Sequence, residues 1–393
     1  MMRYNRLIIL LLALLQAWPL TAFAQDEAQD LTAQAVITVS AKAFSMERLR
    51  DRDYTTQWIG EGRNKSIHIQ SEAALYGLYI CFSQEPRAWI LEEYLGDTWQ
   101  TTTIERSNYQ HQYVALKGTN NIRIKPEGKN QKWFSVSELF VYGEGAVPSH
   151  VQRWQEPAAR NDMMIFFAHP DDEALFFGGA IPTYAGQRQL DVVAVCLNDA
   201  TPVRKTELLN SLWTMGLRTY PVFGPFYDAY SLNLAKAYQH AGENKAKRFA
   251  VGIFRQFKPS VVITHDQNGE YGHGMHRMCA ATALYAFDVA ADPERFSDSA
   301  QAYGAFQVSK LYLHLYPENA IVMDWDVPLP FFAGRTGFEM AQEAYQHHRT
   351  QHRYEQYQVE PRDSKYSSYH FGLAKTNVGP DVLKNDLMEN VGF

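Results

Sequence analysis

The chain has 393 residues, a formal net charge of -6, and a composition that is 46% hydrophobic, 20% charged and 13% aromatic. This length allows two or three domains, and a disordered chain would be poorer in aromatic residues. No long basic run is present, which argues against nucleic acid as a partner.

The first 24 residues have the pattern of a secretory signal peptide. Arg3 and Arg6 precede an apolar run at 7–15, and Ala-Phe-Ala at 22–24 fits the small-x-small rule for cleavage. The apolar run is shorter than the roughly 20 residues that cross a bilayer, so cleavage after Ala24 is favoured over a membrane anchor. No later stretch is long and apolar enough to be a transmembrane segment. The mature protein is therefore expected to be secreted, periplasmic or on the cell surface.

Residues 25–147 are predicted to form an all-β domain. Alternating segments of four to eight residues are separated by Gly, Asn, Asp or Pro, and they read SIHIQ, GLYICF, AWILEEY, YVALKG, NIRIKP and SELFVYG. This spacing is typical of an antiparallel β-sandwich rather than of helices. The order of DRDYTTQW, an apolar strand with a following Trp, NIRIKPEG and SELFVYG resembles a discoidin-like (galactose-binding-like) jelly-roll domain.

Discoidin-like domains often bind glycans through loops at one end. The resemblance therefore implies contact with a polysaccharide or a cell surface. The side chains that could stack on a sugar face are Trp58, Trp99, Tyr109 and Trp133. Because tryptophan is mostly buried wherever it occurs, packing is the favoured role of each.

The three cysteines are expected to be buried free thiols. Cys81 and Cys196 lie inside apolar strand-like runs, where a thiol acts as a small hydrophobic side chain. No Cys-x-x-Cys pair is present, which excludes that form of thiolate zinc site.

Residues 148–393 are predicted to form a doubly wound, Rossmann-like α/β domain, which follows a polar linker. The runs MMIFFA, VVAVCL and SVVITH are continuously apolar, as strands are when both faces of a parallel sheet are covered. Helix-like stretches lie at 174–187, 204–215 and 232–257. This alternation predicts a mostly parallel sheet with right-handed crossovers.

Histidines and carboxylates follow two of these strands. His-Pro-Asp-Asp-Glu occupies 169–173 directly after MMIFFA, and His273 and His276 follow SVVITH. Ligands bind past the carboxyl ends of strands in an open α/β sheet, so both groups are expected at one edge. Crowded carboxylates repel one another and are costly to bury unpaired, whereas a bound cation makes them favourable. These side chains can supply the three N or O ligands of a catalytic zinc.

Two of these motifs resemble a known family. AHPDDE at 168–173 is similar to the signature of the PIG-L/LmbE-like zinc-dependent N-acetylglucosamine deacetylases. YGHGMH at 271–276 is similar to the second motif of that family, usually Gly-His-x-x-His. The similarity spans roughly residues 160–355 and includes Arg204-x-x-Glu207. AYQHHRTQ at 344–351 resembles a late helix of the family that carries His and Gln. Of His347, His348 and His352, only His348 aligns with a family position, and most of them are expected to form a solvated face.

The resemblance implies one Zn²⁺ per chain and specific catalytic roles. Its zinc ligands are His169, Asp172 and His276. Asp171 is implied as the general base that activates the attacking water and later protonates the amine. His273 is implied to assist the oxyanion or the leaving amine.

Further residues are implied to face the substrate. Tyr271 would polarise the acetyl carbonyl, and Arg204 and Asp228 would bind substrate hydroxyls or neighbouring groups. Glu173 is expected to support the ligands or to cap the following helix. The loop 198–201 departs from the Thr-x-Gly usual in the family, which predicts a different acceptor specificity.

The favoured function is that of an exported, zinc-dependent hydrolase that removes the N-acetyl group from N-acetylglucosamine-type sugars or glycans and releases acetate. One alternative keeps the zinc but places the cleaved amide on a non-sugar acyl group. The other is a glycan-binding protein without catalysis, against which the complete set of histidines and aspartates argues.

Overall fold

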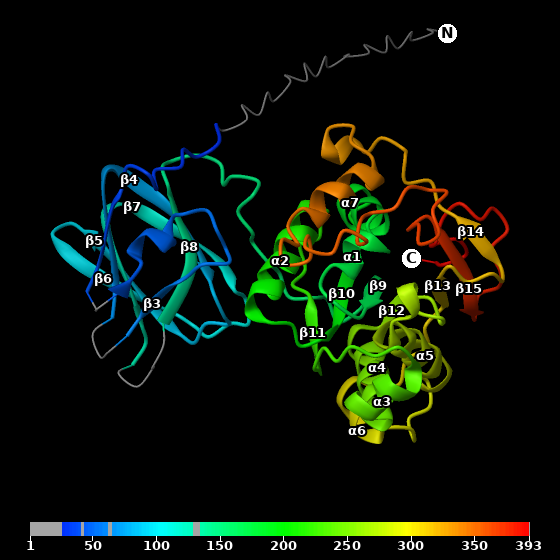
Figure 1. Cartoon of the computed structure of the whole chain (residues 1–393). Helices are drawn as coiled ribbons and strands as arrows, with labels where there is room; N and C mark the ends of the chain where they lie inside the picture. Colours follow the sequence, from blue (N-terminus) through cyan, green and yellow to red (C-terminus); the bar gives the residue numbers. More distant parts are fainter. Residues whose placement is uncertain (1–25, 41–42, 62–64, 129–133, 393) are drawn as a thin grey trace, which may run out of the picture.

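The computed structural model describes residues 26–40, 43–61, 65–128 and 134–392. It contains an all-β part, from β1 to β8, and an α/β part, from β9 to β15 (Figure 1). The predicted signal peptide and Trp133 lie outside the described residues. No helix in the described ranges combines the length and the apolar character needed to cross a membrane.

The first part is an antiparallel sheet with the strand order β2-β3-β8-β4-β7-β5-β6, and β1 pairs with β4. Its strands are β1 (Val36–Val39), β2 (Ala43–Phe44), β3 (Trp58–Gly60), β4 (Ile67–Phe82), β5 (Trp89–Leu95), β6 (Thr98–Ile104), β7 (His111–Pro126) and β8 (Phe134–Tyr142), and a 3-10 helix spans Met46–Leu49. The predicted all-β domain is confirmed.

The long strands β4 and β7 each join two of the predicted segments. SIHIQ and GLYICF are both in β4, whose register against β7 shifts between Gln70 and Leu75 and again before Gly77. Such irregularities bend a strand and increase its twist. The bent sheet encloses a core that includes the fully buried indoles of Trp58 and Trp89. Trp58 is therefore a packing residue, as favoured from the sequence.

The segment between β8 and β9 is more than a polar linker. Val151 and Trp154 are buried, and Trp154 belongs to a hydrophobic core of the α/β part. Its ring packs edge-on against Trp213 and Tyr220, with centroids 5.2 and 5.6 Å away. The part of the connecting segment around Trp154 thus packs as a component of the α/β domain.

The α/β part contains a seven-stranded sheet in the order β11-β10-β9-β12-β13-β15-β14. Its strands are β9 (Asn161–Phe167), β10 (Val192–Asn198), β11 (Val222–Phe226), β12 (Pro259–Thr264), β13 (Lys310–His314), β14 (Ala320–Val322) and β15 (His370–Thr376). The five neighbouring strands β11, β10, β9, β12 and β13 pair in parallel. Strand β15 runs antiparallel to both β13 and β14. The predicted mostly parallel sheet is confirmed.

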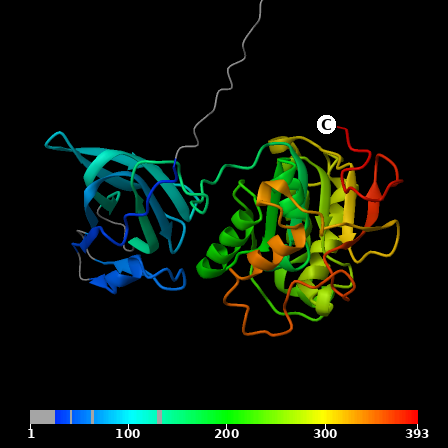
Figure 2. The ribbon, with the colours of Figure 1, turned by 90° about the horizontal axis from the view of Figure 1, so that it is seen from above.

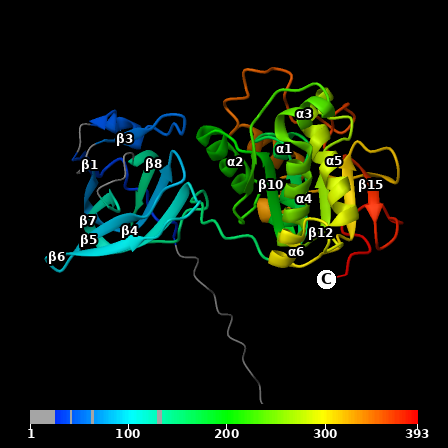
Figure 3. The same cartoon turned by 90° about the horizontal axis from the view of Figure 1, so that it is seen from below.

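Helices cover both faces of this sheet (Figure 2, Figure 3). They are α1 (Asp172–Leu175), α2 (Pro202–Thr214), α3 (Leu234–Ala241), α4 (Glu243–Phe257), α5 (Gly274–Val289), α6 (Ser297–Tyr303) and α7 (Gly337–Tyr345). In β9, Met163 and Ile165 pack on the face that carries α1, α2 and α7, while Met164 and Phe166 pack on the face of α3, α4 and α5. This alternation buries both faces and explains the continuous apolar runs.

Three helix predictions need correction. The stretch 232–257 is two helices, because Gly242 adopts a φ of 82° between α3 and α4, a conformation glycine tolerates without cost. The stretch 174–187 holds only the last two residues of the short α1, which ends at Leu175, and a separate π-helical segment, Pro182–Gln187. The expected late helix at 344–351 ends at Tyr345 and continues as turns.

The prediction of free cysteines is confirmed. Cys81, Cys196 and Cys279 are all buried and unpaired. Burial raises the pKa of each thiol.

Candidate metal and catalytic site

The site lies where the strand order of the α/β sheet reverses. β9 has β10 on one side and β12 on the other, so the chain winds in opposite directions from this pair. His169 follows β9, His265 follows β12 and His314 ends β13. Ligands of doubly wound proteins bind at this switch point, beyond the carboxyl ends of the strands.

Three side chains converge on one point. The Nδ1 atom of His169 lies 3.2 Å from the Nε2 atom of His276. The Asp172 carboxylate lies 3.3 Å from both, through Oδ2 to His169 and through Oδ1 to His276. All three residues are buried. The third nitrogen nearby belongs to His273, whose ring forms a group of potential ligands with His169 and His276.

The spacing of these atoms fits a small tetrahedral cation. Ligand atoms bound at about 2.0–2.1 Å in a tetrahedron are about 3.3–3.4 Å apart, which agrees with the distances around Asp172. Burial alone would raise the pKa of Asp172, but His276 and His265 hold it well below its usual range. The carboxylate is therefore ionised. The donor set of two imidazoles and one carboxylate suits zinc and several other divalent transition metals.

A buried glutamate orients the histidines. Glu270 Oε2 accepts N–H bonds from Nδ1 of both His265 and His276, each at 2.8 Å. Its Oε1 accepts from Nδ1 of His314 at 2.6 Å and from the Asp266 backbone at 3.1 Å. Because Nδ1 of His276 carries its proton toward Glu270, Nε2 keeps its lone pair for a metal, the usual arrangement of a metal-binding histidine.

His265 supports the site rather than binding in it. Its side chain is fully buried, so it is not a solvated histidine. Its Nε2 accepts the backbone N–H of Ala168 at 3.1 Å, which fixes the residue that precedes His169. The same nitrogen lies 3.2 Å from Asp172 Oδ2.

Asp171 occupies a strained position above the cluster. Its φ of 125° and ψ of -30° are rare for a residue with a side chain, and such conformations persist only where the surroundings enforce them. The Asp171 N–H donates to Glu173 Oε2 at 2.8 Å, and the Arg204 guanidinium lies 3.2 Å from Asp171 Oδ1. Burial raises the pKa of Asp171 to about 6, although Arg204 opposes the shift.

Glu173 has the supporting role expected from the sequence. Its Oε1 accepts hydrogen bonds from Ser211 Oγ at 2.5 Å and from His348 Nε2 at 2.6 Å. Because Glu173 also accepts the Asp171 N–H, it ties α1, α2 and the segment after α7 to the backbone of Asp171.

His273 and Tyr271 present donors beside the three converging groups. His273 Nδ1 accepts the Met275 N–H at 3.2 Å and caps α5, so its proton lies on Nε2. Burial and the nearby His169 and His276 lower the pKa of His273 to about 3, which keeps it neutral. The Tyr271 hydroxyl is buried without a hydrogen-bond partner, and its φ is 59°. Both groups are free to donate to a ligand.

Arg204 and Asp228 connect the cluster to its solvent-facing side. The Arg204 guanidinium donates to the Pro170 carbonyl and lies 3.4 Å from Asp228 Oδ2. Asp228 Oδ1 in turn lies 3.4 Å from His169 Nε2. Burial would raise the pKa of Asp228, but His169 and Arg204 lower it to about 2, so the residue is ionised.

The segment after α7 closes one side of the site. Glu207 Oε1 accepts the Thr350 N–H at 2.8 Å, and its Oε2 accepts the Thr350 hydroxyl at 2.6 Å. Of the three histidines His347, His348 and His352, which were expected to be mostly solvated, only His352 is exposed. His348 is fully buried and His347 is partly buried. Glu207, the last residue of the Arg204-x-x-Glu207 motif, thus anchors the segment after α7 through Thr350. The Tyr366 ring, farther along the chain, lies 4.3 Å from Tyr271.

These groups open into a cavity of about 810 Å³. It is lined by all eight predicted site residues: His169, Asp171, Asp172, Arg204, Asp228, Tyr271, His273 and His276. Of the divergent loop 198–201, Thr201 lines the cavity. Arg349, Arg353 and Tyr354 add a wall from the segment after α7.

Sequence reasoning missed two buried groups. Glu270 and His314 have no exposed surface, yet they orient the residues that face the cavity. Glu270 stands directly before the second motif, and a carboxylate in that position was an available signal. His314 ends β13, a position without a local pattern.

Together these features define an α/β domain with a candidate metal centre at its switch point. The family model described as "PIG-L: GlcNAc-PI de-N-acetylase" matches residues 164–287, and this region is a PIG-L domain. That match covers the first motif and the second, together with the strands that carry them.

Two curated relatives are similar to part of the chain. The chain is 25% identical over 194 residues to a 1D-myo-inositol 2-acetamido-2-deoxy-alpha-D-glucopyranoside deacetylase of Catenulispora acidiphila, covering 42% of this chain and 59% of the relative. A similar enzyme of Geodermatophilus obscurus is 26% identical, with 40% and 63% covered. The chain thus spans about three fifths of the length of these relatives.

Two solved structures are similar to separate parts of the chain. An N,N'-diacetylchitobiose deacetylase from Pyrococcus horikoshii is 17% identical, with 51% of this chain and 74% of that chain covered and a TM-score of 0.39. An F5/8 type C domain from Bacteroides fragilis is 13% identical, with 30% and 97% covered and a TM-score of 0.27.

Proposed function

We propose that the protein is a zinc-dependent hydrolase that removes the N-acetyl group from N-acetylglucosamine-type sugars or glycans. Water adds to the acetyl carbon, the C–N bond breaks, and the products are acetate and a free amine. The observation that carries the proposal is the 3.2–3.3 Å spacing of His169, Asp172 and His276 within a PIG-L domain. The names of the curated relatives, which are deacetylases of an acetamido sugar, support the same bond.

The metal would be held by His169, Asp172 and His276, one ion per chain. When bound, zinc acts as a Lewis acid and makes water a stronger nucleophile near neutral pH. Metal analysis of the natively expressed protein would test zinc against iron, cobalt and nickel, which similar ligands also accept.

The side chains around the metal site would carry the proton transfers. Asp171 takes a proton from the attacking water and returns it to the leaving amine, a role supported by its place at the cavity and by the contacts that fix its backbone. His273 and Tyr271 donate hydrogen bonds to the oxygen on which negative charge develops, and this role is supported by their available protons.

Arg204 and Asp228 would bind the sugar. Both line the cavity, and together they offer charged donors and acceptors for hydroxyl groups. Arg204 also lies against Asp171, so it would position the base relative to the substrate.

The remaining features suggest where the enzyme works. We propose that residues 1–24 are a cleaved signal peptide, that 25–147 form a discoidin-like domain and that 148–393 form the deacetylase domain. The protein would then be secreted, periplasmic or on the cell surface, with the first domain contacting a polysaccharide. Sequencing the N-terminus of the exported protein tests this, because cleavage after Ala24 leaves Gln25 first.

Acetate release from N-acetylglucosamine, its oligomers and peptidoglycan fragments tests the activity. We expect the zinc-loaded protein to release acetate and a chelator to abolish it. Asp171→Asn should keep one metal ion per chain and lose about 10²–10⁴-fold in kcat. The matched control is Asp298→Asn, on the exposed side of α6.

Three outcomes would redirect the proposal. Full activity of Asp171→Asn would exclude its role as the base. No acetate from any sugar, with zinc bound, would favour an amidase for non-sugar acyl groups. Absence of metal binding would favour the glycan-binding alternative.

A further inference from the structure

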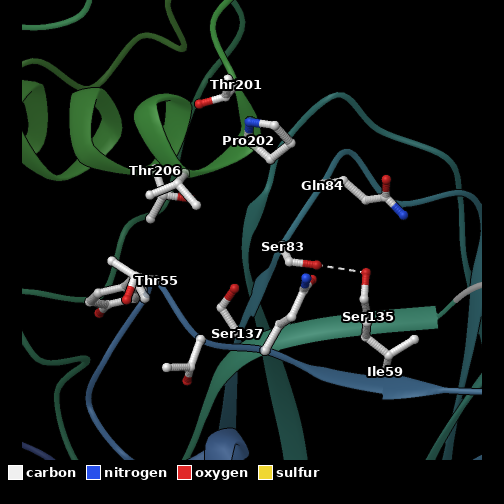
Figure 4. Close-up of a pocket in the computed structure, with 13 residues that line it drawn as sticks. Thr55, Ile59, Ser83, Gln84, Ser135, Ser137, Thr201, Pro202 and Thr206 are labelled. Carbon is white, nitrogen blue, oxygen red and sulfur yellow. Dashed lines mark hydrogen bonds between the residues drawn. The ribbon is translucent and has the colours of Figure 1, made fainter. Parts of the chain in front are cut away.

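A second cavity, of about 490 Å³, lies between the two domains (Figure 4). From the all-β domain it is lined by Thr55, Ser83, Gln84 and Ser137, and from the first turns of α2 by Thr201 and Thr206. The close-up shows the α2 residues facing the strand and loop residues across the space. Ser83 and Ser135 are joined by a hydrogen bond of 2.6 Å at its floor.

The lining favours a neutral, hydroxyl-rich ligand. Within the described residues, no acidic, basic or histidine side chain lines this cavity. Its hydroxyl and amide groups can each donate and accept hydrogen bonds, as sugar hydroxyls do. A charged ligand would lose hydration there without gaining an opposite charge. Ile59, Pro202 and Val203 add apolar surface, which suits the C–H faces of a pyranose ring.

The second cavity adjoins the catalytic one. Thr201 lines both, and Arg204, three residues farther along α2, contacts Asp171. The two cavities are therefore neighbours at the start of α2, which is the arrangement that two adjacent units of one glycan chain require. The volume is within the range of about 300–1,000 Å³ that is usual for ligand sites.

Contacts beside the cavity hold the domains together without filling it. Glu85, next to Gln84, pairs with Lys205 of α2 at 3.2 Å. Asp53, two residues before Thr55, lies 3.7 Å from Arg349, which lines the catalytic cavity. Ion pairs near the surface contribute little stability, but these two lie beside the two loops of the all-β domain that carry Thr55 and Gln84.

We propose that the interdomain cavity is a binding subsite for a neutral sugar unit next to the unit that is deacetylated. The first domain would then form part of the substrate site and would favour oligosaccharides over single sugars. This inference rests on the proposed function for the identity of the sugar, and it goes beyond that function by assigning a site and a preference for chain length.

Two filling variants test the subsite. Gln84→Trp and Thr55→Trp place an indole in the cavity from separate loops, and both positions are exposed enough to preserve folding. The matched control is Thr102→Trp, on the exposed face of β6. The zinc-loaded protein would be assayed with N-acetylglucosamine and with its tetramer, by kcat/KM and, in an Asp171→Asn background, by Kd from calorimetry.

We expect each filling variant to lower the ratio of tetramer to monomer kcat/KM about tenfold, and the tetramer to lose the same factor in affinity, or about 1.4 kcal/mol. Thr102→Trp should leave the ratio unchanged. Equal affinity of the wild type for both sugars, or filling variants with unchanged ratios, would overturn the subsite.

Calorimetry separates this result from the proposed chemistry. Tetramer binding that the filling variants weaken, without acetate release, would leave the subsite standing and remove the deacetylase. Acetate release that is independent of chain length and of the variants would do the reverse.

Discussion

Two buried glutamates support the site in different ways. Glu270 receives N–H bonds from three imidazoles, so it determines which nitrogens of His265, His276 and His314 carry protons. Glu173 receives one backbone N–H, one hydroxyl and one imidazole, so it mainly determines the backbone of Asp171. The difference indicates that metal affinity and proton transfer have separate supports and can be perturbed separately.

Glu270→Gln should have the largest effect. A carboxamide can accept hydrogen bonds only on its oxygen. Its NH2 group would therefore face an imidazole N–H, which places two donors against each other. Burial opposes the charge of Glu270, but His265 and the other imidazoles hold its pKa well below the usual range, so the wild type supplies a full carboxylate. We expect metal affinity to fall about 10–100-fold, as for other partners of metal-bound histidines.

Competition with a metal chelator would measure that loss. Glu243→Gln, an exposed surface substitution, is the control. Unchanged metal affinity in Glu270→Gln would contradict the role of Glu270 and leave the two glutamates equivalent.

Glu173→Gln should act on turnover instead. Its hydroxyl partner can rotate, and His348 can change tautomer because its Nδ1 has no partner. The variant should therefore bind metal normally and lose about tenfold in kcat, near the lower limit for a supporting residue. Zinc stoichiometry and kcat, determined on the same sample, check this. A loss of metal without a loss of turnover per bound metal would refute the separation of roles.

Thr350→Val should have the smallest effect. It removes the hydroxyl bond to Glu207 but keeps the backbone N–H bond, at a cost of about 1 kcal/mol. Because the segment after α7 lines the cavity, we expect KM to rise about two- to fivefold with kcat unchanged. Steady-state kinetics with the preferred sugar would measure it, and Thr102→Val on β6 is the control. A fall in kcat at constant KM would show that this segment acts on the chemistry.

Much of the fold followed from sequence patterns. Continuous apolar runs gave β9, β10 and β12, and short alternating segments gave the all-β domain. The joining of predicted segments into β4 was missed, because bulges let one strand cross both halves of a sheet without a turn. The break at Gly242 was missed because a single glycine can also stand inside a helix, so its positive φ is not evident from the sequence.

The candidate site divided along similar lines. Six of the eight predicted site residues lie in two motifs, so local spacing indicated them, whereas Arg204 and Asp228 were named from the resemblance to the family. His314 contributes through its hydrogen bond to Glu270, and it reaches the site only because β13 lies beside β12. Strand order is set by the whole sheet and leaves no local signature.

The docking of Trp154 limits how this protein can be divided or recombined. A cut immediately before β9 would remove an indole that covers Trp213 and Tyr220, and it would expose an aromatic surface to water. Such a surface favours aggregation. A gene fusion or an excised catalytic fragment must therefore include the connecting segment. The folding unit of the α/β domain thus begins before the first strand of its sheet.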